Sequence, residues 1–210
     1  MFARLVQSKE LNKNQKFERT EYTMNIMIVG VGGQGTLLAS RIIGAATLAT
    51  GADVKLSEVH GMSQRGGSVV TYVKYGEDIA SPVIDKGEAD VILAFEKLEA
   101  LRSVPFLKNG GTLIVNTQET NPMPVITGAA EYPENIIEKI ENMGVNVIAC
   151  DALALAKEAG NLKSVNVALI GVLAKHSNIE KNIWLDALSE TVKPQFLEVN
   201  EKAFCLGYEL

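Results

Sequence analysis

The chain has 210 residues, which suits one complete α/β domain and is short for two. Hydrophobic residues make up 47% of the chain and charged residues 21%, so the composition excludes an intrinsically disordered protein. The 25 acidic and 20 basic residues give a net charge of −5, which offers no general attraction to nucleic acid or to an anionic membrane surface. We therefore expect neither kind of partner.

The cysteine content is low, and it limits the sites that this chain can build alone. Cys150 and Cys205 are the only two cysteines in the sequence. Two isolated thiols supply too few ligands for an iron–sulfur cluster or a structural zinc site, and they do not resemble a disulfide framework. No apolar run approaches the roughly 20 residues that a membrane helix needs. We expect a cytoplasmic protein with no metal site of its own.

Residues 1–23 differ in character from the rest of the chain. They carry five bases and three acids, and they show no apolar period. Met24 stands directly before an apolar run typical of a strand. We expect residues 1–23 to be a disordered extension or the product of an upstream start. A short helical arm that docks on a neighbour is the alternative.

Strands and helices alternate after Met24. Strands are predicted at 25–29, 53–59, 68–74, 89–95, 112–116 and 145–150, and helices at 34–50, 97–106, 134–143 and 152–159. Residues 117–133 contain three prolines and are expected to form a loop, and the last third from residue 162 is helical by pattern. This order predicts one α/β domain over residues 24–210. Its architecture is three-layered and Rossmann-like, with a mostly parallel sheet, helices on both faces and a helical C-terminal third.

A glycine-rich loop joins the first predicted strand to the first predicted helix. Its sequence is Gly30-Val31-Gly32-Gly33-Gln34-Gly35. In this setting the first glycine permits a tight turn, the second lets a phosphate approach the backbone, and the third lets helix and strand pack closely. The free N–H groups of a helix N-terminus favour an anion. Gly30, Gly32, Gly33, Gln34 and Gly35 are thus candidates for binding a phosphate, and a tight turn without a ligand is the alternative.

Glu58 stands where a dinucleotide-binding protein would place its ribose-binding acid. It lies 23 residues after Gly35, near the end of the second predicted strand. This spacing favours a dinucleotide-binding dehydrogenase only weakly, because no substrate-binding second half is visible in the sequence.

A second glycine-rich loop follows the second predicted strand. It is composed of His60, Gly61, Met62, Ser63, Gln64, Arg65, Gly66 and Gly67. In a parallel sheet it would lie beside the first loop, where Arg65 could hold a carboxylate or phosphate through two hydrogen bonds. His60 and Ser63 suggest a base and a nucleophile, but no third orienting acid is evident, so we assign no catalytic residue. Ligand binding and subunit contact both remain open for this loop.

Four further residues have simpler interpretations. We expect His176 to be a solvated histidine at a helix end, and Cys150 to be a core residue at the end of a buried strand. Glu96 and Glu99 follow a strand end, where a carboxylate could meet a ligand. We expect them instead to occupy a solvated helix start, where acids favour the helix dipole.

The two glycine loops together resemble the γ-type domain of the 2-oxoacid:ferredoxin oxidoreductases. The stretches from Gly30 to Gly35 and from Glu58 to Val69 carry this resemblance, and 81–84, 86–90, 94–96 and 114–117 also fit it. Within that superfamily the chain is most similar to the β subunits of indolepyruvate:ferredoxin oxidoreductases. The resemblance spans about Met24 to Glu209.

The resemblance implies a division of labour between subunits. A partner α subunit would carry thiamine diphosphate and iron–sulfur clusters, and the complex would oxidise an arylpyruvate with coenzyme A as co-substrate and ferredoxin as electron acceptor. This chain would complete the assembly, with no cofactor of its own and no activity alone. Two alternatives are a γ subunit of a pyruvate or other 2-oxoacid enzyme, and a stand-alone nucleotide-binding oxidoreductase.

Overall fold

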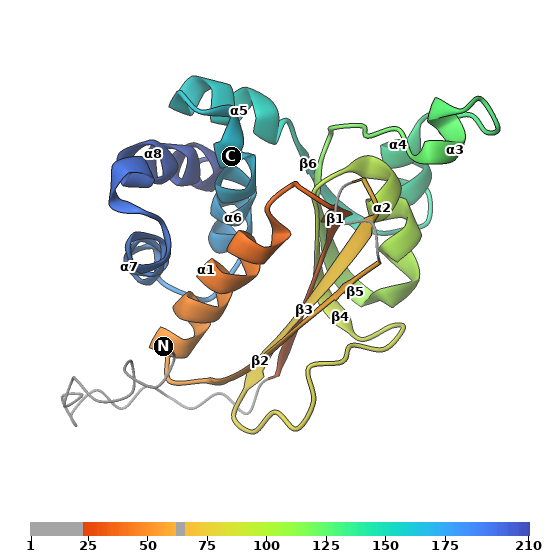
Figure 1. Cartoon of the computed structure of the whole chain (residues 1–210). Coiled ribbons are helices and arrows are strands. Elements are labelled where there is room, and N and C mark those ends of the chain that lie inside the picture. Colours follow the sequence, from red (N-terminus) through yellow and green to blue (C-terminus); the bar gives the residue numbers. More distant parts are fainter. Residues whose placement is uncertain (1–22, 62–65) are drawn as a thin grey trace.

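The computed structural model describes residues 23–61 and 66–210 and has a six-stranded sheet at its centre (Figure 1). The strands are ordered β2-β3-β1-β4-β5-β6 across the sheet. Their bounds are β1 (Met24–Val31), β2 (Asp53–His60), β3 (Ser68–Gly76), β4 (Ala89–Ala94), β5 (Leu107–Asn116) and β6 (Asn146–Cys150).

The sheet is mostly parallel, as predicted, with one strand reversed. β1, β4, β5 and β6 pair in parallel, and β3 pairs antiparallel with both β1 and β2. Because β3 is antiparallel to both of its neighbours, β2 runs in the same direction as β1. The loops that follow β1 and β2 therefore leave the sheet at the same edge.

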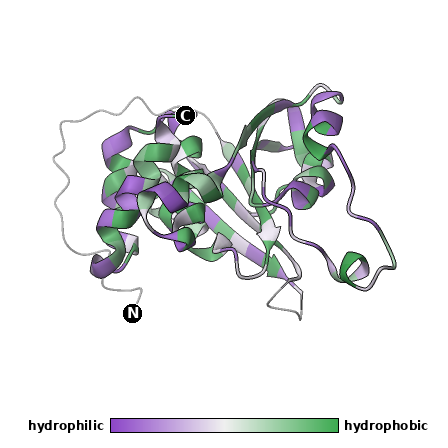
Figure 2. Cartoon of the chain, turned by 90° about the horizontal axis from the view of Figure 1, so that it is seen from above, coloured by the Kyte–Doolittle hydropathy of each residue, from purple (hydrophilic) through white to green (hydrophobic). Residues whose placement is uncertain are grey.

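Helices cover both faces of the sheet, which confirms the three-layer prediction (Figures 1 and 2). One layer contains α1 (Thr36–Ala49), α5 (Ala152–Ala159), α6 (Val165–Lys175), α7 (Lys181–Thr191) and α8 (Leu197–Tyr208). The other contains α2 (Lys97–Ser103) and α4 (Ile136–Glu141). The C-terminal third is helical, as expected. No helix in the described part of the chain is long and apolar enough to span a membrane.

Alternation along the central strands divides the apolar side chains between two cores. Ile26 and Ile28 of β1 face the layer of α1 and α6, whereas Met27 and Val29 face the layer of α2 and α4. All four side chains are at most 3% exposed. A strand that is buried on both faces reads as a continuous apolar run, which is why the sequence indicates it so clearly.

The largest differences from the predicted elements occur where glycine or proline interrupts a pattern. Gly110 and Gly111, which precede the strand predicted at 112–116, lie within β5, which begins at Leu107 and shifts its pairing with β4 between Ala89 and Val91. Gly110 takes the positive φ of a turn, +78°, in an irregular stretch between Leu107 and Thr112, both of which pair with β4. The expected loop at 117–133 contains one helical turn, α3 (Met123–Ile126), which projects from the body of the protein (Figure 1).

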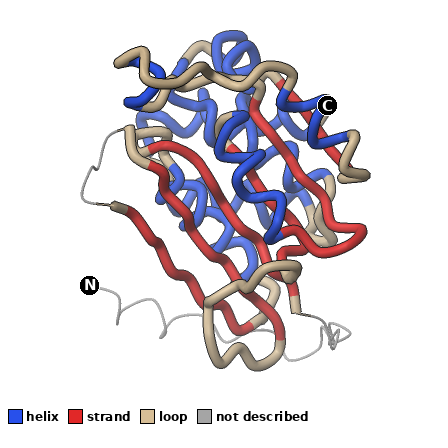
Figure 3. Tube along the Cα trace, turned by 90° about the vertical axis from the view of Figure 1, so that its right-hand side faces the viewer, coloured by secondary structure: helices blue, strands red, loops and turns tan. Residues whose placement is uncertain are grey.

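Helix coverage of the sheet is uneven. Figure 3 turns the side of α2 and α4 toward the viewer, and the strands at one edge have no helix in front of them. Val59 on the edge strand β2 is 55% exposed, whereas Val29 on β1 is fully buried. The edge formed by β2 and β3 is thus open on this face.

Candidate functional site

The first glycine loop takes a conformation that only glycine adopts easily. Gly33 and Gly35 have φ values of +102° and +85°, in the left-handed region. Gly35 is the N-cap of α1, and its left-handed backbone starts the helix at Thr36 rather than at Gln34 as predicted. The strand–loop–helix arrangement predicted for this segment is present.

Gln34 closes the loop from within. Its Oε1 accepts a hydrogen bond from the backbone N–H of Val31 at 2.7 Å, and its own N–H donates to the carbonyl of Val31 at 3.1 Å. A Cβ on Gly30 would lie 2.7 Å from Gln34 Oε1 and 2.9 Å from Phe95 Cβ. Gly30 and Gln34 therefore shape the turn, and the loop residues that line open space are Gly32, Gly33 and Gly35.

The second glycine loop lies directly against the first. The N–H of Gly32 donates to the carbonyl of Gly67 at 2.9 Å, and the N–H of Gly66 donates to the carbonyl of Gly32 at 3.3 Å. Gly32 is thus held on both of its polar backbone groups by the segment that precedes β3. Met62, Ser63, Gln64 and Arg65 lie outside the described residues. Gly61 is exposed at the end of β2, and the Nδ1 of His60 lies 3.0 Å from its carbonyl oxygen.

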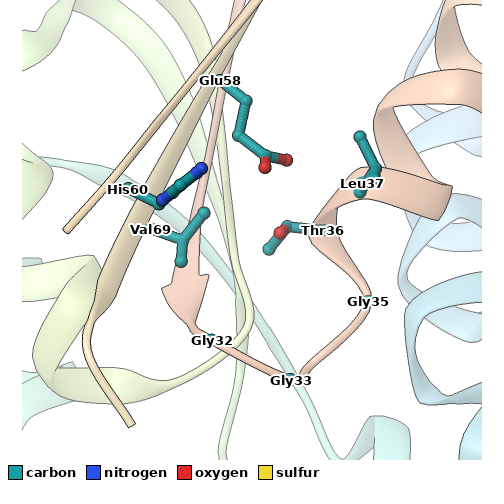
Figure 4. A pocket seen from close by; sticks show the side chains of 8 residues that line it. All are labelled: Gly32, Gly33, Gly35, Thr36, Leu37, Glu58, His60 and Val69. Atoms are coloured by element: carbon teal, nitrogen blue, oxygen red, sulfur yellow. The ribbon is translucent and has the colours of Figure 1, made fainter. Parts of the chain in front are cut away.

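A hollow of about 340 Å³ opens between the first loop and the ends of β2 and β3 (Figure 4). It is lined by Gly32, Gly33, Gly35, Thr36, Leu37, Glu58, His60 and Val69. The loop and the first turn of α1 form one side, and side chains from β2 and β3 form the other. Of the residues predicted to form the site, the structure brings together Gly32, Gly33, Gly35, Glu58 and His60. Sequence reasoning missed Thr36, Leu37 and Val69, which are not distinctive in type.

The electrostatics of this hollow combine a helix N-terminus with a carboxylate. The 14-residue helix α1 has no side-chain cap and no acid in its first turn, so none of its own side chains neutralises its positive end. The carboxylate of Glu58 points into the hollow (Figure 4), and the hydroxyl of Thr71 donates to it over a long 3.5 Å. An anion is favoured beside the glycine loop, and a hydrogen-bond donor is favoured beside Glu58. A phosphorylated ligand that also carries hydroxyl or amino groups matches both preferences.

Glu96 and Glu99 lie at a helix start, as expected, but the expectation that this start is solvated was wrong, because both residues are buried. Their exposed fractions are 1% and 4%. Glu96 accepts hydrogen bonds from the N–H groups of Leu98 and Glu99 at 2.9 and 3.1 Å and from the hydroxyl of Tyr132 at 2.9 Å. Burial raises the pKa of Glu96, and these three donors oppose that effect. Tyr132 lies 36 residues further along the chain, so no local pattern indicates this partnership.

The remaining candidates lie away from the hollow. His176 is exposed at the C-cap of α6, as expected. Cys150 is 6% exposed and joins the apolar core, as expected, and burial raises its pKa to about 11. Within residues 23–61 and 66–210, no group of three or more His, Cys, Asp or Glu side chains is arranged to hold a metal ion.

Comparison with known proteins identifies relatives over nearly the whole chain. The indolepyruvate oxidoreductase subunit IorB of Thermococcus kodakarensis is 44% identical over 191 residues, which cover 87% of this chain and 93% of that protein. A pyruvate/ketoisovalerate oxidoreductases common subunit gamma of Thermococcus litoralis is 26% identical over 82% of this chain and 86% of that protein.

The fold is also found in a solved structure, that of a keto/oxoacid ferredoxin oxidoreductase gamma subunit from Geobacter sulfurreducens. The TM-score is 0.65 at 25% identity, and the match covers 89% of this chain and 96% of that one. The family model for pyruvate ferredoxin/flavodoxin oxidoreductase matches residues 25–210, from the second residue of β1 to the C-terminus. The chain therefore belongs to the pyruvate ferredoxin/flavodoxin oxidoreductase family.

Proposed function

We propose that this chain is the β subunit of an indolepyruvate:ferredoxin oxidoreductase. The complex would oxidise an arylpyruvate with coenzyme A, releasing carbon dioxide and an aryl-acetyl-CoA and passing two electrons to ferredoxin. The observation that carries the proposal is the 44% identity with IorB over 93% of that protein, against 26% with the pyruvate/ketoisovalerate gamma subunit. Residues 24–210 would act as a single γ-type domain, and residues 1–23 would be a dispensable extension.

Within this complex we assign the hollow at the glycine loop to coenzyme A. The uncapped start of α1 suits the diphosphate of the coenzyme, since backbone N–H groups at a helix N-terminus bind phosphate oxygens. Glu58, on the opposite wall, suits a hydroxyl or amino donor of the adenosine. The hollow of about 340 Å³ would hold part of the coenzyme, and the rest would extend toward the partner subunit.

The electron-transfer chemistry would belong to the partner. The sequence has two cysteines, whereas one iron–sulfur cluster commonly takes four cysteine ligands. Thiamine diphosphate and the clusters would therefore lie in the larger α subunit, and this chain would complete the assembly and orient coenzyme A. We place the complex in the cytoplasm, where free thiols such as Cys150 and Cys205 remain reduced.

Reconstitution tests this proposal. The chain is purified alone and also co-expressed under anoxic conditions with the proposed larger α subunit from the same organism. We expect the isolated chain to be colourless and inactive, and the complex to reduce a redox dye only with both an arylpyruvate and coenzyme A. Turnover by the isolated chain would contradict the division of labour.

The second candidate is a γ subunit of a pyruvate or other 2-oxoacid enzyme, favoured by the 26% identity with the pyruvate/ketoisovalerate common subunit gamma. The same complex is assayed with indolepyruvate, phenylpyruvate, pyruvate and 2-oxoisovalerate. A higher kcat/KM for the aryl substrates supports the first candidate, and a preference for pyruvate or 2-oxoisovalerate supports the second.

A further inference from the structure

Glu99 is a buried carboxylate that reaches from α2 to the start of β3. Its side chain is 5% exposed and has two partners. The hydroxyl of Ser68 donates to Oε2 at 2.5 Å, and the guanidinium of Arg102 pairs with Oε1 at 2.5 Å. Burying a charge in this way is unfavourable unless its hydrogen bonds are satisfied. The carboxylate therefore holds its two partners firmly, and one of them, Ser68, is an exposed residue far from α2 in sequence.

The helix itself does not need this carboxylate. Glu96 is the N-cap of α2, and its oxygens already accept the N–H groups of Leu98 and Glu99. Glu99 instead projects toward β3. The two acids thus have different roles. Glu96 caps α2, whereas the described side-chain partners of Glu99 are Ser68 and Arg102.

Ser68 connects Glu99 to the hollow through the backbone. It directly follows Gly67, whose carbonyl accepts the N–H of Gly32, and it directly precedes Val69, which lines the hollow. Gly66 adds a second bond to Gly32. The short segment from Gly66 to Val69 is therefore held by Gly32 at one end and by pairing with β1 at the other, and the side chain of Glu99 adds a tie at Ser68, where the strand begins.

We propose that Glu99 is a positioning residue for the coenzyme A hollow, acting through Ser68 to hold Gly66 and Gly67 against Gly32. This inference rests on the proposed function of the hollow. Without the bond from Ser68 to Glu99, Ser68 and Val69 would still pair with Val31 and Gly30 in the sheet, but Gly66 and Gly67, which lie beyond the strand, would be held by their backbone bonds to Gly32. The first glycine loop would then be held less firmly, and the free N–H groups at the start of α1 would be less well placed for a phosphate. Coenzyme A binding would weaken, although neither Ser68 nor Glu99 lines the hollow.

The test uses the assembled complex with Ser68→Ala, Ser68→Thr and Glu99→Gln, and with Ser189→Ala as a matched control. Ser189 is an exposed serine of α7 whose hydroxyl donates to the carbonyl of Asp186 in its own helix, away from the hollow. Three quantities are measured for each complex. They are the apparent KM for coenzyme A at saturating arylpyruvate, the kcat, and the rate of amide hydrogen exchange in a peptide spanning residues 30–38.

We expect Ser68→Ala and Glu99→Gln to raise the KM for coenzyme A about three- to tenfold. Each substitution removes or weakens one charge-assisted hydrogen bond, and this bond affects the ligand only indirectly. The kcat would stay within about twofold, because no reacting group is removed. Exchange in residues 30–38 would accelerate. Ser68→Thr, which keeps the hydroxyl, and Ser189→Ala would behave like the unmodified complex.

Three results would overturn the proposal. They are an unchanged KM for coenzyme A in Ser68→Ala, a fall in kcat without a change in KM, and loss of subunit assembly in place of a KM effect. The Gly32→Ala variant shows which hypothesis is wrong: that Glu99 positions the loop, or that coenzyme A binds in the hollow. If Gly32→Ala raises the KM and Ser68→Ala does not, coenzyme A binds at the loop but Glu99 does not position it. If Gly32→Ala also leaves the KM unchanged in an intact complex, the assignment of coenzyme A to this hollow is wrong.

Discussion

The side-chain amide of Asn166 donates a hydrogen bond to the carbonyl of Gly35 at 3.3 Å, across 131 residues of sequence. Asn166 is 4% exposed at the start of α6, and its own Oδ1 accepts the N–H of Val167 at 2.9 Å. The same carbonyl of Gly35 accepts the N–H groups of Leu38 and Ala39 in the first turn of α1. The C-terminal helices therefore support the glycine loop directly, and the site depends on both ends of the domain.

Substitution of Gly35 should be more harmful than substitution of Gly33. Both have a positive φ, so alanine at either position is strained by about 1–2 kcal/mol. A Cβ on Gly35 would also lie 2.6 Å from Asn166 Nδ2, whereas a Cβ on Gly33 has no atom within 4 Å. Urea unfolding of Gly35→Ala and Gly33→Ala should show the larger loss of stability for Gly35→Ala. Equal losses would mean that Asn166 does not constrain the loop.

The crossing of α6 and α8 should tolerate no side chain at its centre. A Cβ on Gly171 would overlap the backbone of Phe204 in α8, and a Cβ on Gly207 would overlap the backbone of Ala168 in α6. We expect Gly171→Ala to lower the free energy of unfolding by about 3 kcal/mol or more, because two backbones must separate. The thermal midpoint of the purified chain measures this.

Gly44→Ala provides the matched control for that substitution, since Gly44 also lies inside a helix. Its Cβ would meet only the end of the Leu56 side chain, 3.0 Å away, and Leu56 is 45% exposed and free to rotate. Alanine is the better helix former by about 1 kcal/mol, so Gly44→Ala should stay within about 1 kcal/mol of the unmodified protein. If Gly171→Ala were equally mild, the close crossing of the two helices would be contradicted.

The buried carboxyl of Glu96 predicts how stability changes with pH. Because burial raises its pKa in the folded chain, Glu96 binds its proton more tightly there than in the unfolded chain, where its pKa is near 4.5. Its stabilising contribution is full below that value and is lost as the pH rises through the raised folded pKa. Relative to Glu96→Gln, which cannot ionise, the unmodified chain should lose free energy of unfolding between pH 4.5 and 8. A constant difference across that range would show that the pKa is not raised.

The two cysteines should differ in reactivity toward an alkylating reagent. Cys150 lies in the core, and burial together with the nearby charge of Asp151 raises its pKa to about 11, so little thiolate forms at pH 8. Cys205 on α8 is partly exposed. Mass spectrometry after iodoacetamide treatment of the native chain should find Cys205 labelled well before Cys150. Labelling of Cys150 at an equal rate would mean that the end of β6 opens to solvent.

The sequence predicts most of the fold because the central strands are apolar on both faces. The runs ending at Val29 and Ala94 are typical of buried strands, and the glycine spacing indicates the turn into α1. The reversed direction of β3 could not be predicted, since antiparallel and parallel strands have the same composition. Residues 112–116 form a strand as predicted, but the extension of β5 back to Leu107 could not be predicted, because Gly110 and Gly111 locally indicate a turn.

The candidate site was predicted only where one local motif defines it. The glycines of the first loop stand out by spacing, and Glu58 by its position near the end of a strand. The partners that hold the loop do not stand out, because each depends on a contact between distant segments. Asn166 and Glu99 are ordinary polar residues in sequence, and only the folded chain places them beside Gly35 and Ser68. The burial of Glu99 could not be predicted because it depends on Ser68, which lies 31 residues away in sequence.

A titration with coenzyme A decides whether this chain provides the coenzyme A hollow of a 2-oxoacid oxidoreductase complex. The initial rate of arylpyruvate-dependent dye reduction is measured against coenzyme A for the unmodified complex and for Gly32→Ala, beside size-exclusion chromatography of the same samples. A Cβ at Gly32 should block the approach of a phosphate to the backbone, so we predict a KM for coenzyme A raised about tenfold in a complex that still assembles. Two results would contradict coenzyme A binding at this hollow. One is an unchanged KM for coenzyme A in a Gly32→Ala complex that assembles. The other is impaired assembly of Gly32→Ala with an unchanged KM for coenzyme A in the fraction that does assemble.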